Sequence, residues 1–246
     1  MTTAAKPICD AATLPDPTGD YLTMVFPHSV GGGKNQPGWM EWQAYYVNLQ
    51  ITLSGTNCQI VCGQSSTTVP YTQNGNDPNS GNLQFSFSVN SNNCSYNIDV
   101  YQPSGRGLIL QGTVTIALSG GPKTLEARML KLPVSLPSGT YDVTSVTNSE
   151  LTGRLILGVS STFQQTGENA QPITPAWNGT GAPNRSMLAF SADIVVNGVT
   201  EPTDFNALYA PKWSGSAFSQ KFHGTASQGP TADDSDWSAQ DSSPEP

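Results

Sequence analysis

Residues 83–100, LQFSFSVNSNNCSYNIDV, carry the clearest pattern in the chain. Leu83, Phe85 and Phe87 alternate with polar residues, and after a short polar link a second run alternates in the same way. Successive side chains of a strand point to opposite faces, so this pattern predicts two strands with one face each on a core. The link contains only residues 90–93, which predicts that the two strands form a hairpin.

Residues 108–118 continue the alternation after a glycine-rich turn, so we expect three consecutive antiparallel strands, a meander. Similar runs predict further strands at residues 21–26, 45–53, 58–62, 140–146, 151–159 and 188–196. The pair Asn197 and Gly198 predicts a two-residue hairpin turn, because both residues tolerate positive φ. The strand that follows contains Pro202, which predicts a place at the edge of a sheet.

Three segments are harder to interpret. Residues 124–132 fit either an amphipathic helix or a strand. Residues 63–82 and 164–184 are polar and rich in turn-forming residues, and each is too long for a simple turn. We therefore expect two long loops there.

The composition favours short strands joined by turns. Charged residues make up 11% of the chain and hydrophobic residues 36%, a balance that disfavours a helical bundle. We predict an all-β fold, an antiparallel two-sheet sandwich of jelly-roll type, with a closed β-barrel as the alternative. The expected division is a proline-rich N-terminal arm at 1–20, a single β-sandwich domain at 21–224 and an acidic flexible tail at 225–246.

The net charge of −8 is unevenly distributed. Residues 225–246 contain five acids and no base, so the rest of the chain is nearly neutral and lacks a basic stripe. We therefore do not expect nucleic acid as a partner. No apolar run is long enough for a transmembrane helix, and the N-terminus lacks the apolar region of a signal peptide. These features predict a soluble protein and do not assign a compartment.

The cysteines and histidines do not suggest a metal site. Cys58 and Cys62 would share one face of a strand, too far apart to form a disulfide with each other, and Cys94 could pair with either. His28 and His223 are far apart in the sequence, and no CxxC spacing occurs. We expect no metal and no cofactor.

Residues 37–53, PGWMEWQAYYVNLQITL, form the densest aromatic cluster. Sugar rings stack on aromatic faces, and amide or carboxylate side chains hydrogen-bond sugar hydroxyls. This chemistry gives a candidate ligand-binding set of Trp39, Glu41, Trp42, Gln43, Tyr46 and Trp177, with Trp213 as a further aromatic residue of the same kind. The alternative interpretation is that these aromatic side chains fill a core.

For function, we expect a non-enzymatic recognition protein that binds glycans or a cell surface through aromatic-bearing loops. We assign no catalytic residues, because no nucleophile motif is present, and the chain is not expected to be an enzyme. A pore-forming or structural assembly protein, including a homo-oligomer, is one alternative. A β-barrel enzyme without a metal, cyclase-like or carbohydrate-active, is the other.

Overall fold

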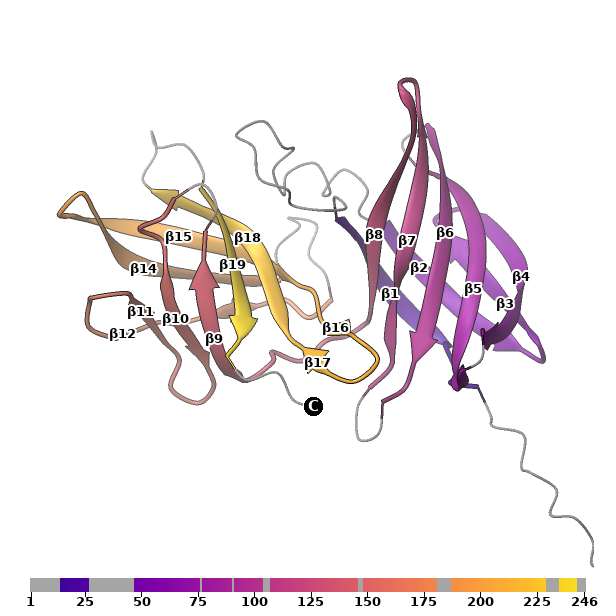
Figure 1. Cartoon of the computed structure of the whole chain (residues 1–246), viewed down its shortest axis with the longest axis horizontal. Coiled ribbons are helices and arrows are strands. Elements are labelled where there is room, and N and C mark those ends of the chain that lie inside the picture. Colours follow the sequence, from indigo (N-terminus) through magenta and orange to yellow (C-terminus); the bar gives the residue numbers. More distant parts are fainter. Residues whose placement is uncertain are drawn as a thin grey trace, which may run out of the picture.

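The computed structural model describes residues 14–26, 47–75, 77–89, 91–103, 107–145, 148–180, 187–228 and 235–242. These residues form a closed antiparallel barrel of eight strands, a nine-stranded antiparallel sheet curled into a half-barrel, and a two-stranded hairpin between them (Figure 1). The prediction of an all-β chain is confirmed. None of the described segments forms a helix that could cross a membrane.

The barrel is built from the first eight strands in sequence order. They are β1 (Gly19–Phe26), β2 (Val47–Ser54), β3 (Asn57–Cys62), β4 (Ser65–Asn74), β5 (Asp77–Val89), β6 (Asn92–Tyr101), β7 (Ile109–Leu118) and β8 (Gly121–Lys131). Each strand pairs with the next, and β8 pairs with β1 to close the ring. Closure leaves no strand edge unpaired, so the predicted meander continues around a complete barrel.

The barrel interior is filled with apolar side chains. The inward positions of β5 and β6 include Phe85 and Tyr96, whose rings stack with centroids 4.8 Å apart. Side chains just fill the interior of an eight-stranded barrel. Residues 14–18 cover one end: the hydroxyl of Tyr71 donates to the carbonyl of Pro15 (2.6 Å), and that of Tyr21 donates to the carbonyl of Pro17 (2.8 Å). The last residues of the expected N-terminal arm are therefore part of the barrel.

The second sheet has the order β12-β11-β10-β9-β19-β18-β15-β14-β13. Its strands are β9 (Gly139–Thr144), β10 (Gly153–Leu157), β11 (Thr162–Gln165), β12 (Gln171–Pro172), β13 (Ala176–Trp177), β14 (Leu188–Val196), β15 (Val199–Tyr209), β18 (Lys221–Gln228) and β19 (Ser235–Asp241). Aromatic rings fill its concave face. Phe190 and Phe205 stack at 4.6 Å, and Trp237 meets both rings edge-on.

Two glutamine side chains join the curled ends of this sheet. The amide of Gln165 in β11 donates to the carbonyl of Val195 and accepts from its backbone N–H, both at 2.8 Å. Gln171 in β12 makes the same two-point contact with Asp193, at 2.7 and 2.8 Å. These side chains take the place of a neighbouring strand along the edge of β14, because they satisfy the backbone groups that an edge would leave unpaired.

The barrel and the second sheet contact each other directly. Leu22, Met24 and Leu130 point outward from β1 and β8 and belong to the same buried cluster as the core of the second sheet. The hairpin of β16 (Lys212–Trp213) and β17 (Phe218–Ser219) also contacts the barrel. Figure 1 shows this hairpin between the two sheets.

Several sequence-based expectations differ from this fold. The first sheet closes on itself, so it is not one layer of the expected sandwich, and the alternative, a closed β-barrel, describes it. The expected loop at 63–82 contains β4 and the start of β5, and that at 164–184 contains β12 and β13. The strand pattern of β4 was hidden because polar residues such as Thr67 occupy inward positions, and β12 and β13 contain two residues each, too few to show a period. Residues 124–132 are strand and not helix up to Lys131.

Two further expectations differ because the deciding contacts come from distant strands. β15 contains Pro202 and was expected at the edge of a sheet, but it lies between β14 and β18. Its pairing with β18 begins at Thr203, so Pro202, which has no amide hydrogen, falls outside that ladder. The segment expected to be a flexible acidic tail contains the end of β18 and all of β19. Trp237 in β19 is 2% exposed, and its indole N–H donates to the carbonyl of Thr225 (2.9 Å).

Candidate functional site

The described residues contain one of the six side chains that the sequence proposed for ligand binding. Trp39, Glu41, Trp42, Gln43 and Tyr46 lie outside the described residues, and their role stays a prediction.

Trp177 is half-buried in β13 at the border of the second core. Its indole N–H donates to the carbonyl of Val134 (2.8 Å), and its ring meets Tyr209 and Phe222 edge-on. These contacts give Trp177 a packing role.

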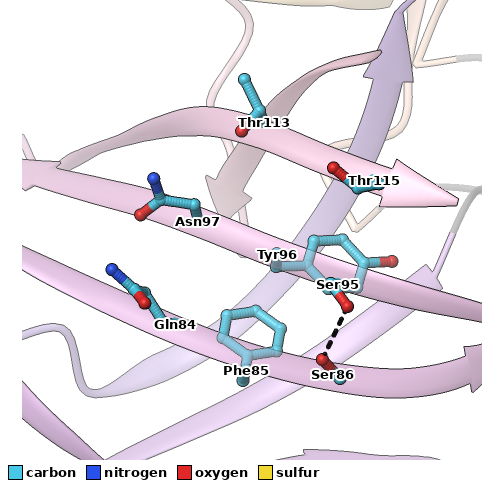
Figure 2. Close-up of a pocket in the computed structure, with 8 residues that line it drawn as sticks. All are labelled: Gln84, Phe85, Ser86, Ser95, Tyr96, Asn97, Thr113 and Thr115. Carbon is cyan, nitrogen blue, oxygen red and sulfur yellow. Dashed lines mark hydrogen bonds between the residues drawn. The ribbon is translucent and has the colours of Figure 1, made fainter. Parts of the chain in front are cut away.

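A shallow hollow lies instead on the outer face of the barrel, over β5, β6 and β7. Its volume is about 360 Å³. Figure 2 shows the residues that line it, namely Gln84, Phe85, Ser86, Ser95, Tyr96, Asn97, Thr113 and Thr115. Phe85 and Tyr96 are buried and belong to the barrel core, so the six polar residues supply the side chains that face outward.

Strand register places these six side chains in two lines across the barrel wall. Gln84 pairs with Asn97, and Asn97 with Thr113; we call these three residues the amide row. The hydroxyl row runs parallel to the amide row, two residues away from it on each strand, and consists of Ser86, Ser95, Thr115 and, on β8, Thr124. Alternate residues of a strand share a face, so pairing in this register brings both rows to the outer surface.

The side chains of the hydroxyl row bind to one another. Ser86 donates to Ser95 at 2.9 Å, as the dashed line in Figure 2 shows, and the hydroxyls of Thr115 and Thr124 are 3.0 Å apart. Cross-strand hydroxyl pairs of this kind stabilise a sheet. Each hydroxyl oxygen can accept a second hydrogen bond, so the row also presents acceptors to a ligand.

The amide row keeps more of its hydrogen-bonding capacity. The side-chain oxygen of Asn97 accepts from Asn82 (2.8 Å), and Gln84 donates to the side-chain oxygen of Asn82 (3.3 Å). Within the described part of the chain, the amide hydrogens of Asn97 and the hydroxyl of Thr113 have no partner. The row therefore offers donors and acceptors side by side.

One carboxylate lies beside the amide row, on the next outward position of β6. Asp99 accepts from Asn82 (2.8 Å) and from the hydroxyl of Tyr101 (3.2 Å). Burial raises the pKa of Tyr101, and the charge of Asp99 raises it further, so the phenol keeps its proton and donates. Hydrogen bonds thus hold the negative charge at the rim of the hollow.

The six outward side chains of this surface are suited to hydrogen bonding. The six outward side chains are amides and hydroxyls, which form hydrogen bonds and carry no charge at neutral pH. General acid-base catalysis needs a titrating group within reach of the substrate, and none of the six titrates near neutral pH. Across the described residues, no group of three or more His, Cys, Asp or Glu side chains is placed to hold a metal ion.

From the sequence, the polar residues that alternate with apolar ones in residues 83–118 were expected only to face solvent on one side of a meander, and no site was proposed there. A signal was nevertheless present. Asp99 is the single charged residue among the outward positions of β5 to β7 from Asn82 to Ala117, whereas solvent-facing strand positions ordinarily include several charges. What the sequence did not contain is the register that aligns the three strands.

The comparisons with known proteins do not identify the chain. No protein-family model matches it, and no curated protein matches it. A similar solved structure is that of a candidate outer membrane protein from Bacteroides fragilis, 12% identical, aligned over 91% of this chain and 96% of that chain, with a TM-score of 0.31. A TM-score of this size does not establish a common fold.

Proposed function

We propose that this chain is a non-enzymatic recognition protein that binds a neutral glycan, such as one displayed on a cell surface, through the hollow over β5 to β7. The observation that carries the proposal is the set of six outward amide and hydroxyl side chains on three paired strands. A site of this composition matches a ligand whose own groups are mostly hydroxyls and amides.

The lack of charge on these six side chains supports a neutral ligand. An anionic ligand would lose hydration on entering the hollow without gaining an opposite charge there, and the carboxylate of Asp99 at the rim already accepts hydrogen bonds from Asn82 and Tyr101. Sugar hydroxyls both donate and accept, and the amide row supplies the matching pair in the amide hydrogens of Asn97 and the carbonyl oxygen of Gln84. Specific recognition by a few placed polar groups is the usual arrangement in small-molecule sites.

A membrane-inserted barrel and a glycoside-cleaving enzyme, two of the alternatives, have less support than a binding site. Strands of a membrane-inserted barrel carry apolar side chains outward, whereas β5 and β6 carry theirs inward and expose Gln84, Ser86 and Ser95. A glycoside-cleaving enzyme needs two carboxyl groups that flank the bond, and the residues that line the hollow include none.

A broad glycan array tests the proposal, with wild-type protein beside Gln84→Ala and Asn97→Ala. Loss of one hydrogen bond to the ligand, about 0.5–1.5 kcal/mol, should weaken binding roughly two- to twelvefold in each variant. Gln59→Ala is the matched control, because Gln59 is an exposed outward amide on β3. Trp39→Ala and Trp42→Ala run on the same array test the residues that the sequence proposed.

Selective binding that Gln84→Ala and Asn97→Ala weaken, and that Gln59→Ala leaves unchanged, would support the site. An array without signal from folded protein would refute the glycan proposal. Binding that is insensitive to both amide variants but lost in Trp39→Ala or Trp42→Ala would move the site away from the hollow.

A further inference from the structure

The β16–β17 hairpin is fixed to the barrel at the edge of the amide row. The amide of Gln111 donates to the carbonyl of Trp213 (2.6 Å) and accepts from its backbone N–H (2.9 Å). Glu126 forms an ion pair with Lys212 (3.6 Å). Gln111 precedes Thr113 by two residues on β7, and Glu126 pairs with Thr113 across to β8, so both anchors are direct neighbours of the hollow.

The side chain of Trp213 belongs to neither of the two buried apolar clusters. Trp237 belongs to the core of the second sheet and Trp177 packs against it, whereas Trp213, which is partly buried, does neither. Its backbone is nevertheless held at two points by Gln111, a residue 102 positions away. A large apolar ring that is held in place and keeps part of its surface exposed can contact a ligand with that part.

The charged side chains at this position of the rim are paired with one another. Glu126 pairs with both Lys212 and the buried guanidinium of Arg128. The positive charges of these two side chains are therefore offset in part by a carboxylate at the rim, and a neutral ligand does not have to pass an isolated charge to reach Trp213.

We infer that Trp213 forms an aromatic subsite at the end of an extended binding surface, and that the ligand is an oligosaccharide rather than a single sugar. This inference rests on the proposed glycan function. The step from Thr113 to Gln111 along β7 is about 7 Å, and the Gln111 side chain and the Trp213 backbone add to it. A ligand that contacts both the amide row and Trp213 has to extend over several sugar units.

The amide row and Trp213 would contribute to binding through different interactions. The amide row supplies hydrogen bonds that orient one sugar, and the indole face of Trp213 supplies stacking for another. The two hydrogen bonds between Gln111 and the backbone of Trp213 hold the hairpin before the ligand arrives, which reduces the entropy that binding would otherwise cost.

Isothermal titration with two homologous series, the cello- and the chito-oligosaccharides from the single sugar to the hexasaccharide, tests the inference. Wild-type affinity should rise with chain length. Trp213→Ala should weaken binding of the longer sugars about tenfold and leave the single sugar unchanged, while Trp213→Phe keeps a ring and most of the affinity. Gln111→Ala, which releases the hairpin, should resemble Trp213→Ala.

Gln84→Ala separates this inference from the proposal on which it rests, because it should weaken binding at every chain length. Affinity that does not depend on chain length and is unaffected by Trp213→Ala, but is weakened by Gln84→Ala, would overturn the Trp213 subsite and leave the glycan site standing. No binding of any sugar in either series by folded wild-type protein would overturn both. The melting temperature of Trp213→Ala should fall less than that of a core variant such as Trp237→Ala, since Trp213 belongs to neither buried cluster.

Discussion

The glutamine contact between β11 and β14 predicts a large stability effect from a single amide. Gln165 is 5% exposed; it donates to the carbonyls of Val195 (2.8 Å) and Glu150 (3.0 Å) and accepts from the N–H of Val195 (2.8 Å). Gln165→Met keeps the length of the side chain and removes all three hydrogen bonds. At about 1 kcal/mol net for each bond, the free energy of unfolding should fall by about 3 kcal/mol.

Equilibrium unfolding in urea, followed by tryptophan fluorescence, measures this loss. In a chain of this size it corresponds to a fall in melting temperature of about 6–12 °C. Gln164→Met is the matched control: Gln164 is the neighbouring residue, its side chain is exposed, and it bonds only the carbonyl of Glu168. We expect that control to stay within about 0.5 kcal/mol of the wild type.

A second substitution tests the direction of the hydrogen bonds. In Gln165→Glu the carboxylate faces the carbonyls of Val195 and Glu150 and cannot donate to them. Burial beside these carbonyls should raise the folded-state pKa of the new carboxyl group above its unfolded value, so the lost stability should be smaller at pH 5 than at pH 7. If Gln165→Met unfolds at the same urea concentration as Gln164→Met, the amide does not hold these two strands together.

Three further predictions concern the junction of the two sheets and the last strand. Burial, together with the charges of Lys221 and Arg128, lowers the pKa of His223 to about 3 in the folded chain. The imidazole of the unfolded chain titrates near pH 6.5, so below this pH the unfolded chain binds a proton that the folded chain does not. The free energy of unfolding should therefore fall by up to about 1.4 kcal/mol for each pH unit below 6.5. Urea unfolding at pH 7 and pH 5 measures this slope, which His223→Gln should reduce. Trp237→Ala should cost about 3–5 kcal/mol by calorimetry, and Trp237→Phe clearly less, since the ring fills the second core; equal small losses would contradict the buried position of β19. Leu22→Ala should destabilise the barrel and the second sheet together, because the side chain of Leu22 packs between them. Near- and far-UV circular dichroism should then show one unfolding transition. Two separate transitions would contradict the single domain predicted from the sequence.

The strands themselves were largely readable from the sequence. The alternation in residues 83–118 gave β5, β6 and β7 and the inward positions of Phe85 and Tyr96, because the two-residue period of a strand is local. The turn at Asn197 was readable for the same reason: Asn197 and Gly198 adopt φ values of 51° and 76°, as a two-residue hairpin turn requires.

The strands that were missed carry polar residues at inward positions or lie in segments of misleading composition. β4 has Thr67 on its inward side, and the acidic surroundings of β19 concealed the alternation of Trp237 and Ala239. Only part of the candidate site could be predicted from the sequence. Its outward amides and hydroxyls follow from the period, but nothing local to Gln84, Asn97 or Thr113 says that the three lie in one row.

The sequence by itself determined that the chain is all-β and which side chains of its clearest strands face a core, because both depend on residues a few positions apart. Only the tertiary structure decided that β8 pairs with β1 to close a barrel, that β19 enters between β9 and β18, and that Gln111 holds Trp213 from 102 positions away. The physical reason is that strand pairing draws on backbone groups that every residue carries. The choice among partners is therefore made by packing and closure of the whole sheet and leaves no local mark on the sequence.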